Sequence, residues 1–282
     1  MSVIYKYKSI STMQKLEYLI DSLKNHYLYF SKPSELNDNF DCFMPVSFDG
    51  TNEDKQDFCD RYNRKNNENL TVEIINEKLR SNEFYESLFD DDYMNYLNHL
   101  HICSFCKDGL SENMWAKYAD ELKGVCIGYN ITKPDGCSSY YIKHEKIDAT
   151  KLISDNWQTD GHFDYLQIHE VLYDNVGQYK YLLFQIEKAG NIDNFMHKKQ
   201  CWSNEREVRC IIFNENKAVL PNLKIIYPDE TLNSIYFGQN VSQNIIDCIK
   251  SIVRENYKNY KDIKFYNVKP DYYQYRLVPY EI

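Results

Sequence analysis

The sequence has no long hydrophobic run. A helix needs about 20 predominantly apolar residues to span a bilayer, and no segment of the chain approaches that length. The first six residues, Met1-Ser2-Val3-Ile4-Tyr5-Lys6, also lack the apolar segment of a signal peptide. We therefore expect a cytoplasmic protein without a membrane partner.

Several motifs of well-known enzyme classes are missing too. The chain contains no Gly-rich phosphate loop with its Lys, no nucleophile elbow, and no order of His, Asp and Ser that suggests a hydrolase triad.

The chain also has fewer positive than negative charges. Its 33 Lys and Arg residues and 42 Asp and Glu residues give a net charge of −9. Phosphate backbones bind clustered cations. This balance disfavours nucleic-acid binding over a broad surface, although a local basic pocket remains compatible with it.

The cysteine pattern argues against both disulfides and metal. The nine cysteines are odd in number and scattered, and several lie inside apolar runs such as Val125-Cys126-Ile127, so we interpret them as reduced core residues. Cys103 and Cys106 have metal-ligand spacing, but no second pair matches them, and in a strand they face opposite ways. We expect them to pack in the core, and we expect no metal cofactor.

What the chain does contain is apolar and aromatic: 43% of its residues are hydrophobic, including 26 Tyr and 14 Phe, which indicates a folded core. Runs of β-branched and aromatic residues predict strands at 3–7, 27–30, 101–105, 124–129, 205–213, 235–238 and 263–268, with weaker ones at 140–142 and 170–173. Apolar residues at helical spacing predict helices at 12–24, 112–122, 179–199 and 243–257, the last capped by Ser242.

These elements predict an α+β fold. We expect a single mixed-sheet domain over residues 1–282, with a helical insertion at about 52–100 where the chain is charged, Asn-rich and helical in pattern. The strand, helix and strand between residues 235 and 268 have the length of a parallel βαβ connection. No internal repeat or low-complexity linker marks a domain boundary.

Several different polar and aromatic motifs are spread along the chain. Tyr5-Lys6-Tyr7-Lys8, Leu36-Asn37-Asp38-Asn39-Phe40-Asp41, Cys103-Ser104-Phe105, Met114-Trp115-Ala116-Lys117-Tyr118 and the group Lys199, Trp202, Glu205, Glu207 and Arg209 follow one another in this order. Together they resemble the bacterial domain-of-unknown-function family numbered 2971. The sequence departs from that family's pattern at Lys8, Asn39 and Cys106, where the family would have Arg, Pro and Ser. The resemblance implies that the motifs belong together, and it implies no particular reaction.

The segment Glu205-Arg206-Glu207-Val208-Arg209 alternates between charged and apolar residues. The strand period of two places Glu205, Glu207 and Arg209 on one face and Val208 on the other. One interpretation is a solvated charge ladder on an exposed strand, which contributes little stability. The large apolar Trp202 just before the strand favours a functional site instead.

Glu-x-Glu at a strand start resembles the catalytic element of ADP-ribosyltransferases. The resemblance implies that Glu207 stabilises an oxocarbenium-like transition state of NAD as a fixed negative charge, that Glu205 orients an acceptor, and that Lys8 and Ser31 complete the site. NAD would then be a substrate, and a protein or nucleic acid would be the acceptor. The substrate-binding residues predicted for this site are Tyr7, Lys8, Ser31, Asn37, Asp38, Asp41, Trp115, Tyr118, Lys199, Trp202 and Arg209.

Two of these groups allow other interpretations. Asn37, Asp38 and Asp41 fit a turn that satisfies its own backbone amides; alternatively, Asp38 and Asp41 bind a divalent ion together with Glu207, as in a metal-dependent nuclease or phosphodiesterase. The helical spacing of Met114, Trp115 and Tyr118 is more typical of a core face than of a surface that stacks a base.

Three functional hypotheses follow from these motifs. The preferred one is an NAD-consuming, ADP-ribosyltransferase-like or glycohydrolase-like effector, such as a bacterial toxin or a phage-defence component. The alternatives are the metal-dependent nuclease and a non-enzymatic module that senses a nucleotide or another small-molecule ligand. All three require Asp38, Trp115 and Glu207 to converge on one site, although they lie far apart in the sequence.

Overall fold

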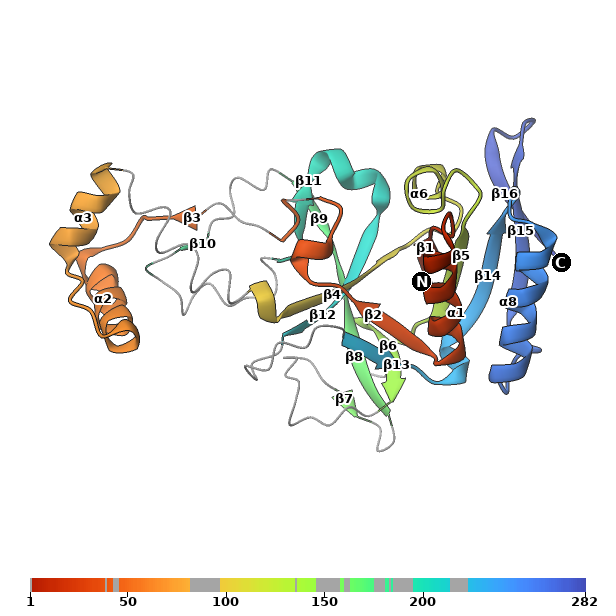
Figure 1. Cartoon of the computed structure of the whole chain (residues 1–282), viewed down its shortest axis with the longest axis horizontal. Helices are drawn as coiled ribbons and strands as arrows, with labels where there is room; N and C mark the ends of the chain where they lie inside the picture. The colour runs from red at the N-terminus through yellow and green to blue at the C-terminus, as the bar shows by residue number, and fades with distance from the viewer. Residues whose placement is uncertain are drawn as a thin grey trace. The chain divides into compact units, whose positions relative to one another are not determined.

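The computed structural model of the protein describes residues 2–38, 40–42, 46–81, 97–134, 136–145, 158–159, 163–174, 181–182, 184, 195–213 and 223–282. The chain forms two compact units, whose elements are labelled in Figure 1. The first unit contains Met1–Ser31, His101–Val171 and Cys201–Ile282, and the second contains Lys32–Leu100 and Leu172–Gln200. That the whole chain acts as one domain stays a prediction.

A large mixed sheet forms the frame of the protein. Its strand order is β16-β15-β14-β5-β1-β4-β12-β8-β6, and β7 pairs with β8. β5 pairs antiparallel with both β1 and β14, whereas β14 and β15 pair in parallel. The strands are β1 Val3–Lys8, β4 Leu100–Cys106, β5 Val125–Asn130, β6 Tyr140–Glu145, β7 Gln158–Thr159, β8 Phe163–Glu170, β12 Glu207–Phe213, β14 Leu232–Gly238, β15 Lys264–Asp271 and β16 Arg276–Glu281.

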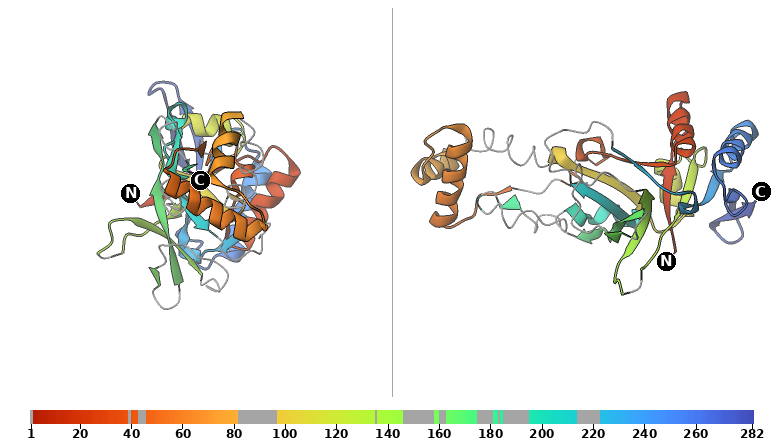
Figure 2. Two further views of the ribbon diagram at one scale, coloured as in Figure 1. Left: turned by 90° about the vertical axis from the view of Figure 1, so that its left-hand side faces the viewer. Right: turned by 90° about the horizontal axis from the view of Figure 1, so that it is seen from below.

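Two amphipathic helices cover one face of this sheet, as the right-hand view of Figure 2 shows. α1 (Met13–Lys24) is capped by Thr12, whose hydroxyl accepts a hydrogen bond from the Lys15 amide at 3.2 Å. α8 (Gln243–Asn256) connects β14 to β15. The predicted C-terminal βαβ unit and the α+β class are therefore confirmed. None of the helices in the described residues is long and apolar enough to cross a membrane.

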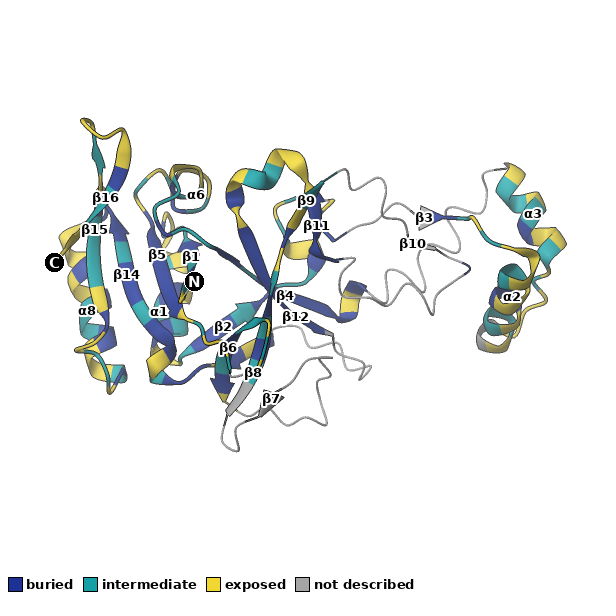
Figure 3. Cartoon of the chain, turned by 180° about the vertical axis from the view of Figure 1, so that it is seen from behind, coloured by how far each residue is buried: buried dark blue, intermediate teal, exposed yellow. Residues whose placement is uncertain are grey.

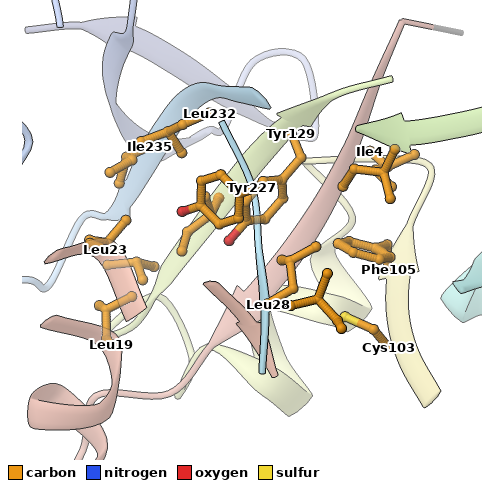
Figure 4. Packing of buried hydrophobic residues seen from close by; sticks show 14 of the residues in the cluster. Ile4, Leu19, Leu23, Leu28, Cys103, Phe105, Tyr129, Tyr227, Leu232 and Ile235 are labelled. Atoms are coloured by element: carbon orange, nitrogen blue, oxygen red, sulfur yellow. The ribbon is translucent and has the colours of Figure 1, made fainter. Parts of the chain in front are cut away.

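The main hydrophobic core lies between this face and the two helices (Figure 4). The side chains that point into it follow the strand period of two, with Ile4 from β1 and Phe105 from β4. A short antiparallel pair, β2 (Tyr27–Phe30) and β13 (Leu223–Ile226), contributes further apolar residues to the same core. The 3-10 turn η5 (Asp229–Thr231) leads from this pair into β14.

The opposite face of the sheet carries a smaller cluster under the short helix α6 (Glu112–Tyr118). Tyr7, Cys106 and Cys126 come from β1, β4 and β5, and Trp115 comes from α6. Residues opposite each other in the register, such as Tyr7 and Cys126, share this face. Figure 3 shows these strands buried along most of their length. The candidate site is built beside this cluster.

The second unit contains α2 (Asn52–Asn66), α3 (Val72–Ser81) and two short parallel strand pairs. β3 (Val46–Ser47) pairs with β10 (Tyr181–Leu182), and β9 (Leu172–Asp174) pairs with β11 (His197–Lys199). α2 starts with a capping box, in which the Thr51 hydroxyl accepts from the Asp54 amide at 3.1 Å. The 3-10 turn η1 (Pro33–Glu35) belongs to this unit as well.

Two sequence predictions meet this unit with different results. Helices at 52–66 and 72–81 confirm the helical character of the insertion in that part, and residues 82–96 lie outside the described residues. The predicted helix at 179–199 is wrong at both ends, since residues 181–182 and 197–199 are strands. Its apolar residues have helical spacing, but at both ends the backbone hydrogen-bonding groups pair with neighbouring strands instead of with a helical turn.

Candidate functional site

The site begins at α6, a seven-residue helix that ends earlier than the sequence predicts. The prediction extended the helix to residue 122, whereas the backbone leaves the helix after Tyr118. Asp120, Glu121 and Leu122 all have positive φ, at 51°, 55° and 66°. Tertiary contacts hold this turn: a Cβ on Gly124 would lie 2.5 Å from the Lys8 carbonyl oxygen, so the chain can pass β1 there only with glycine.

A second short segment, the 3-10 helix η4 (Gln200–Glu205), contacts α6. Each of the two elements contributes two side chains to this contact. The Tyr118 hydroxyl donates to Glu205 Oε1 at 2.7 Å, and Lys117 Nζ lies 3.9 Å from the same oxygen. Lys117 Nζ also lies 4.5 Å from the ring centre of Trp202, a cation–π distance. We call Lys117, Tyr118, Trp202 and Glu205 the Glu205 cluster.

The Glu205 cluster combines a buried charge with more accessible partners. Glu205 is only 3% exposed, while the Lys117 side chain is 45% exposed and Trp202 is half-buried. A buried carboxylate interacts strongly with any charge that approaches it, because the effective dielectric constant around it is lower than that of bulk water. The cluster therefore offers a fixed negative charge beside an indole and an ammonium group that a ligand can reach.

The predicted strand at 205–213 begins two residues late, at Glu207. Arg206 has a φ of 46°, its amide donates to the Ser203 carbonyl at 3.2 Å, and its own carbonyl accepts from the Lys107 amide at 3.1 Å. Glu205 is thus the last residue of a 3-10 helix, and the alternation of side chains in the strand begins only after it. Its predicted place on one strand face with Glu207 is wrong for this reason.

Glu207 and Arg209 do share a face, and they form a buried pair. Arg209 Nε lies 2.6 Å from Glu207 Oε1 and its Nη2 lies 3.1 Å from Oε2, so the contact is bidentate. Arg209 is fully buried and Glu207 is 6% exposed. This burial rules out a solvated charge ladder. The pair also neutralises the carboxylate that the sequence suggested as the catalytic charge.

Tyr7 and Trp115 support the Glu205 cluster from within the core. Their rings meet edge to face at 5.5 Å, Trp115 Nε1 donates to the Gly109 carbonyl at 3.0 Å, and the Tyr7 hydroxyl donates to the Asp108 carbonyl at 2.7 Å. Burial raises the pKa of Tyr7 well above its usual value. The structure gives both residues a packing role, which agrees with the core interpretation of the helical spacing around Trp115.

Lys8 and Ser31 lie in the first unit at other places. Lys8 is on the same face of β1 as Ile4, the face of the main core, whereas Tyr7 points to the α6 side. Burial, helped by the charge of Lys6, lowers the pKa of Lys8 to about 8. Ser31 makes a two-bond bridge with Ile102 of β4, its amide and carbonyl each pairing at 2.8 Å. Within the described residues, no hydrogen bond or ion pair joins either residue to Glu205 or Glu207.

Asn37, Asp38, Asp41 and Lys199 belong to the second unit. The local turn predicted for this loop is confirmed, because Asp38 accepts hydrogen bonds from the amides of Phe40 and Asp41, each at 2.9 Å. Lys199 Nζ lies 4.0 Å from the ring centre of Phe40. The convergence of Asp38 with Trp115 and Glu207 stays a prediction.

Sequence reasoning missed three groups in these units. Lys117 lies inside a quoted motif, but an exposed helical lysine carries no signal until Trp202 is placed beside it. Lys198 forms a buried ion pair with Asp41 at 3.4 Å. His197 Nδ1 lies 2.8 Å from Asp174 Oδ2. The Lys-rich end of the predicted helix concealed both pairs, since cations there suggest a helix terminus or a phosphate contact.

Cys103 and Cys106 are both buried free thiols, and burial raises the pKa of Cys106 to about 11. Across the described ranges, no group of three or more His, Cys, Asp or Glu residues is arranged to hold a metal ion. The packing role predicted for this pair is confirmed.

The fold and the Glu205 cluster define an α+β protein with a buried carboxylate site. Residues 114–210 match the family described as "Protein of unknown function (DUF2971)". Over this segment, the match confirms the resemblance that the motifs indicated. The matched segment contains α6, the Glu205 cluster and the Glu207–Arg209 pair. No curated protein and no solved structure matches the chain.

Proposed function

We propose that the protein consumes NAD at the Glu205 cluster, as an ADP-ribosyltransferase-like or NAD glycohydrolase-like enzyme. The observation that carries this proposal is the geometry of Glu205, a carboxylate 3% exposed, 2.7 Å from the Tyr118 hydroxyl and beside the half-buried Trp202. An effector of this kind would deplete NAD in a target cell, which is how it would act as a toxin or a phage-defence component.

In this mechanism the bond between nicotinamide and the anomeric carbon of the ribose breaks, and nicotinamide leaves with the bonding electron pair. Positive charge develops at the ribose, and the fixed carboxylate of Glu205 stabilises it electrostatically. Water or an acceptor group then forms the new bond to the anomeric carbon and releases its proton. The Tyr118 hydroxyl holds the carboxylate in place, since a fixed charge needs no reorganisation during the reaction.

The other members of the cluster would bind the dinucleotide. An indole face is a stacking surface for the planar nicotinamide or adenine ring. Lys117, with its side chain 45% exposed, supplies a cation for the pyrophosphate. The roles of the two acids are therefore exchanged relative to the Glu-x-Glu pattern: Glu205 supplies the charge, and Glu207 orients Arg209 through its bidentate contact.

The test is nicotinamide release from NAD by the purified full-length protein, with water alone and with protein and nucleic-acid acceptors. We expect Glu205→Gln to slow release by roughly 100-fold or more, the usual cost of removing one preorganised electrostatic group. Glu112→Gln, on the exposed side of the same helix, is the matched control and should leave the rate unchanged. Absence of release from the wild-type protein under every condition would reject the proposal.

A second candidate is a non-enzymatic module that senses a nucleotide, and the neutralised pair Glu207–Arg209 favours it. Both residues are buried and paired, which suits a scaffold that binds a ligand without transforming it. Calorimetric titration with NAD and with ADP separates the two candidates. Binding that requires Trp202 but produces no nicotinamide would support the sensor and count against the enzyme.

A further inference from the structure

Three tyrosines at the tip of the β15–β16 hairpin are almost fully exposed. Tyr272, Tyr273 and Tyr275 have relative exposures of 81%, 101% and 93%. Aromatic rings bury large areas when they find a partner, so a group of them kept in water at one turn points to an interaction surface. The tip extends past the end of β14, whose last pair in the register joins Gly238 to Val268 (Figure 1).

Hydrogen bonds fix the backbone of the turn that carries these rings. Asp271 Oδ1 accepts hydrogen bonds from the amides of Tyr273 and Gln274, at 2.9 and 3.1 Å. Tyr275 has a φ of 50°, in the left-handed region, which lets the chain return into β16. The tip therefore presents its rings from a closed and hydrogen-bonded loop.

Pairing of a further strand with the hairpin edge is disfavoured. β16 is the last strand of the sheet, and the Ile282 amide donates to the Phe265 carbonyl at 3.0 Å. Antiparallel bonding alternates, so Leu277, Pro279 and Glu281 direct their backbone groups to the open side. Proline has no N–H to donate there, and edge strands use it to block association. A partner of this hairpin is therefore bound through side chains.

Two cations, Lys269 and Arg276, lie on the strands that lead into and out of this turn, and Asp271 is the register partner of Arg276. Lys269 and Arg276 are exposed, and neither forms an ion pair within the described residues. By the register they lie on the same face of the hairpin, together with Tyr280, over which Lys269 Nζ sits at 6.0 Å from the ring centre. The surface thus interleaves aromatic rings with positive charge on a chain whose net charge is −9.

We propose that this hairpin tip binds single-stranded nucleic acid. Bases stack on exposed aromatic rings with little sequence preference, and cations beside the rings contact the phosphates. The turn Asp271-Tyr272-Tyr273-Gln274-Tyr275-Arg276 contains no Trp, Phe, Leu or Ile, the residues with which a surface helix or loop enters a bilayer. The proposal does not depend on the Glu205 cluster, so each can fail alone.

The test is fluorescence anisotropy of labelled 20-nucleotide single strands, one of DNA and one of RNA, titrated with the full-length protein at low salt. We expect replacement of Tyr273 or Tyr275 by leucine to weaken binding roughly tenfold each, because an aliphatic side chain cannot stack, and replacement by phenylalanine to preserve it. Tyr18→Leu is the control, since Tyr18 on α1 is 62% exposed. The DNA and RNA arms decide which strand is preferred.

Salt provides an independent readout. Two phosphate contacts to a single strand predict a slope of about −1.4 in a plot of log affinity against log salt, and Lys269→Gln with Arg276→Gln should flatten it. Lys264→Gln, near the other end of β15, should not. The proposal is overturned if neither oligonucleotide binds, if the leucine variants bind as well as the wild type, or if the tip binds phosphatidylserine vesicles in place of the oligonucleotides.

Discussion

Tyr118 donates a hydrogen bond to a carboxylate from which water is largely excluded: its hydroxyl oxygen lies 2.7 Å from Glu205 Oε1, across a sequence separation of 87 residues. A helix and a 3-10 turn distant in sequence are thereby joined at the point where the cation of Lys117 also approaches. Since Glu205 is 3% exposed, it cannot exchange this bond for one to bulk water. The contact therefore bears on stability as well as on the proposed chemistry.

Replacing Tyr118 with phenylalanine should lower the free energy of unfolding by about 1.5–3 kcal/mol, the net contribution of a hydrogen bond to a charged group. Urea denaturation monitored by circular dichroism measures the change. Tyr18→Phe is the control, because its hydroxyl accepts a hydrogen bond from the exposed Gln14 side chain, and it should shift the free energy by less than about 0.5 kcal/mol. An unchanged midpoint for Tyr118→Phe would show that the bond does not hold η4 against α6.

The Glu207–Arg209 pair predicts non-additive mutations. Arg209→Met leaves a carboxylate buried without its bidentate partner, which should cost about 3–5 kcal/mol. Combining it with Glu207→Met removes both charges, and we expect the double variant to recover most of the loss, as buried ion pairs replaced by apolar residues often do. A double-mutant cycle from urea denaturation gives the coupling free energy. Additive effects of the two substitutions would contradict a direct pairing.

Lys8 predicts a specific pH dependence. Its pKa falls from 10.5 to about 8 on folding, chiefly because of burial, so between these values the unfolded chain binds more protons than the folded one. Stability contributed by this group therefore rises with pH across that window, and the penalty is fully present below pH 8. Lys8→Met should stabilise the protein by about 1–3 kcal/mol at pH 7, the full shift being reduced because the side chain is only partly buried.

The pH series itself provides the check. The stability difference between Lys8→Met and the wild type should shrink as the pH rises from 8 to 10.5, because both proteins then have an uncharged group at this position. Lys123→Met, at an exposed position, corrects for the titration of other groups. A difference that stays constant over this range would mean that the amine keeps its ordinary pKa in the folded protein.

The sequence predicted those parts of the fold that are decided locally. α8 places Ile246, Ile249, Ile252 and Val253 on one buried face at helical spacing. β14 is rich in apolar and aromatic residues, and β15 contains Phe265, Tyr266 and Val268. The prediction for this βαβ unit agrees with the structure because a helix that connects two parallel strands packs against their sheet in essentially one way. The strand bounds at β1, β2 and β4 agree with their predictions to within one or two residues for the same reason.

The site was less predictable, because its geometry depends on backbone conformations that tertiary contacts impose. Arg206 and Leu122 both have positive φ, which no residue pattern in their neighbourhood signals. At Leu122 the cause is visible: its carbonyl accepts from the Asn240 amide at 3.0 Å, and a Cβ on Gly238 would lie 2.2 Å from the same oxygen. These contacts end α6 at Tyr118 and set the position from which its hydroxyl reaches Glu205.

The second unit offers the last prediction, at the ion pair of Asp41 and Lys198. The charged atoms lie 3.4 Å apart, and the side chains are 4% and 6% exposed. Lys198→Met removes the cation and leaves Asp41 buried, so the loop that carries Asp41 should open more often. Hydrogen exchange at the Asp41 amide, which donates to the Asp38 carbonyl at 2.9 Å, reports that opening and should accelerate by 10-fold or more, equivalent to about 1.4 kcal/mol.

Lys199→Met is the matched control, because the neighbouring lysine contacts the same loop through the exposed ring of Phe40. A cation–π contact at an exposed site contributes about 0.5–1 kcal/mol, so its loss should change exchange at Asp41 by at most about fivefold. Restoring neutrality with Asp41→Asn beside Lys198→Met should return exchange at position 41 toward the wild-type rate. Equal acceleration in both lysine variants would show that the loop is held by its own turn, through the carbonyl and carboxylate of Asp38, and not by the buried pair.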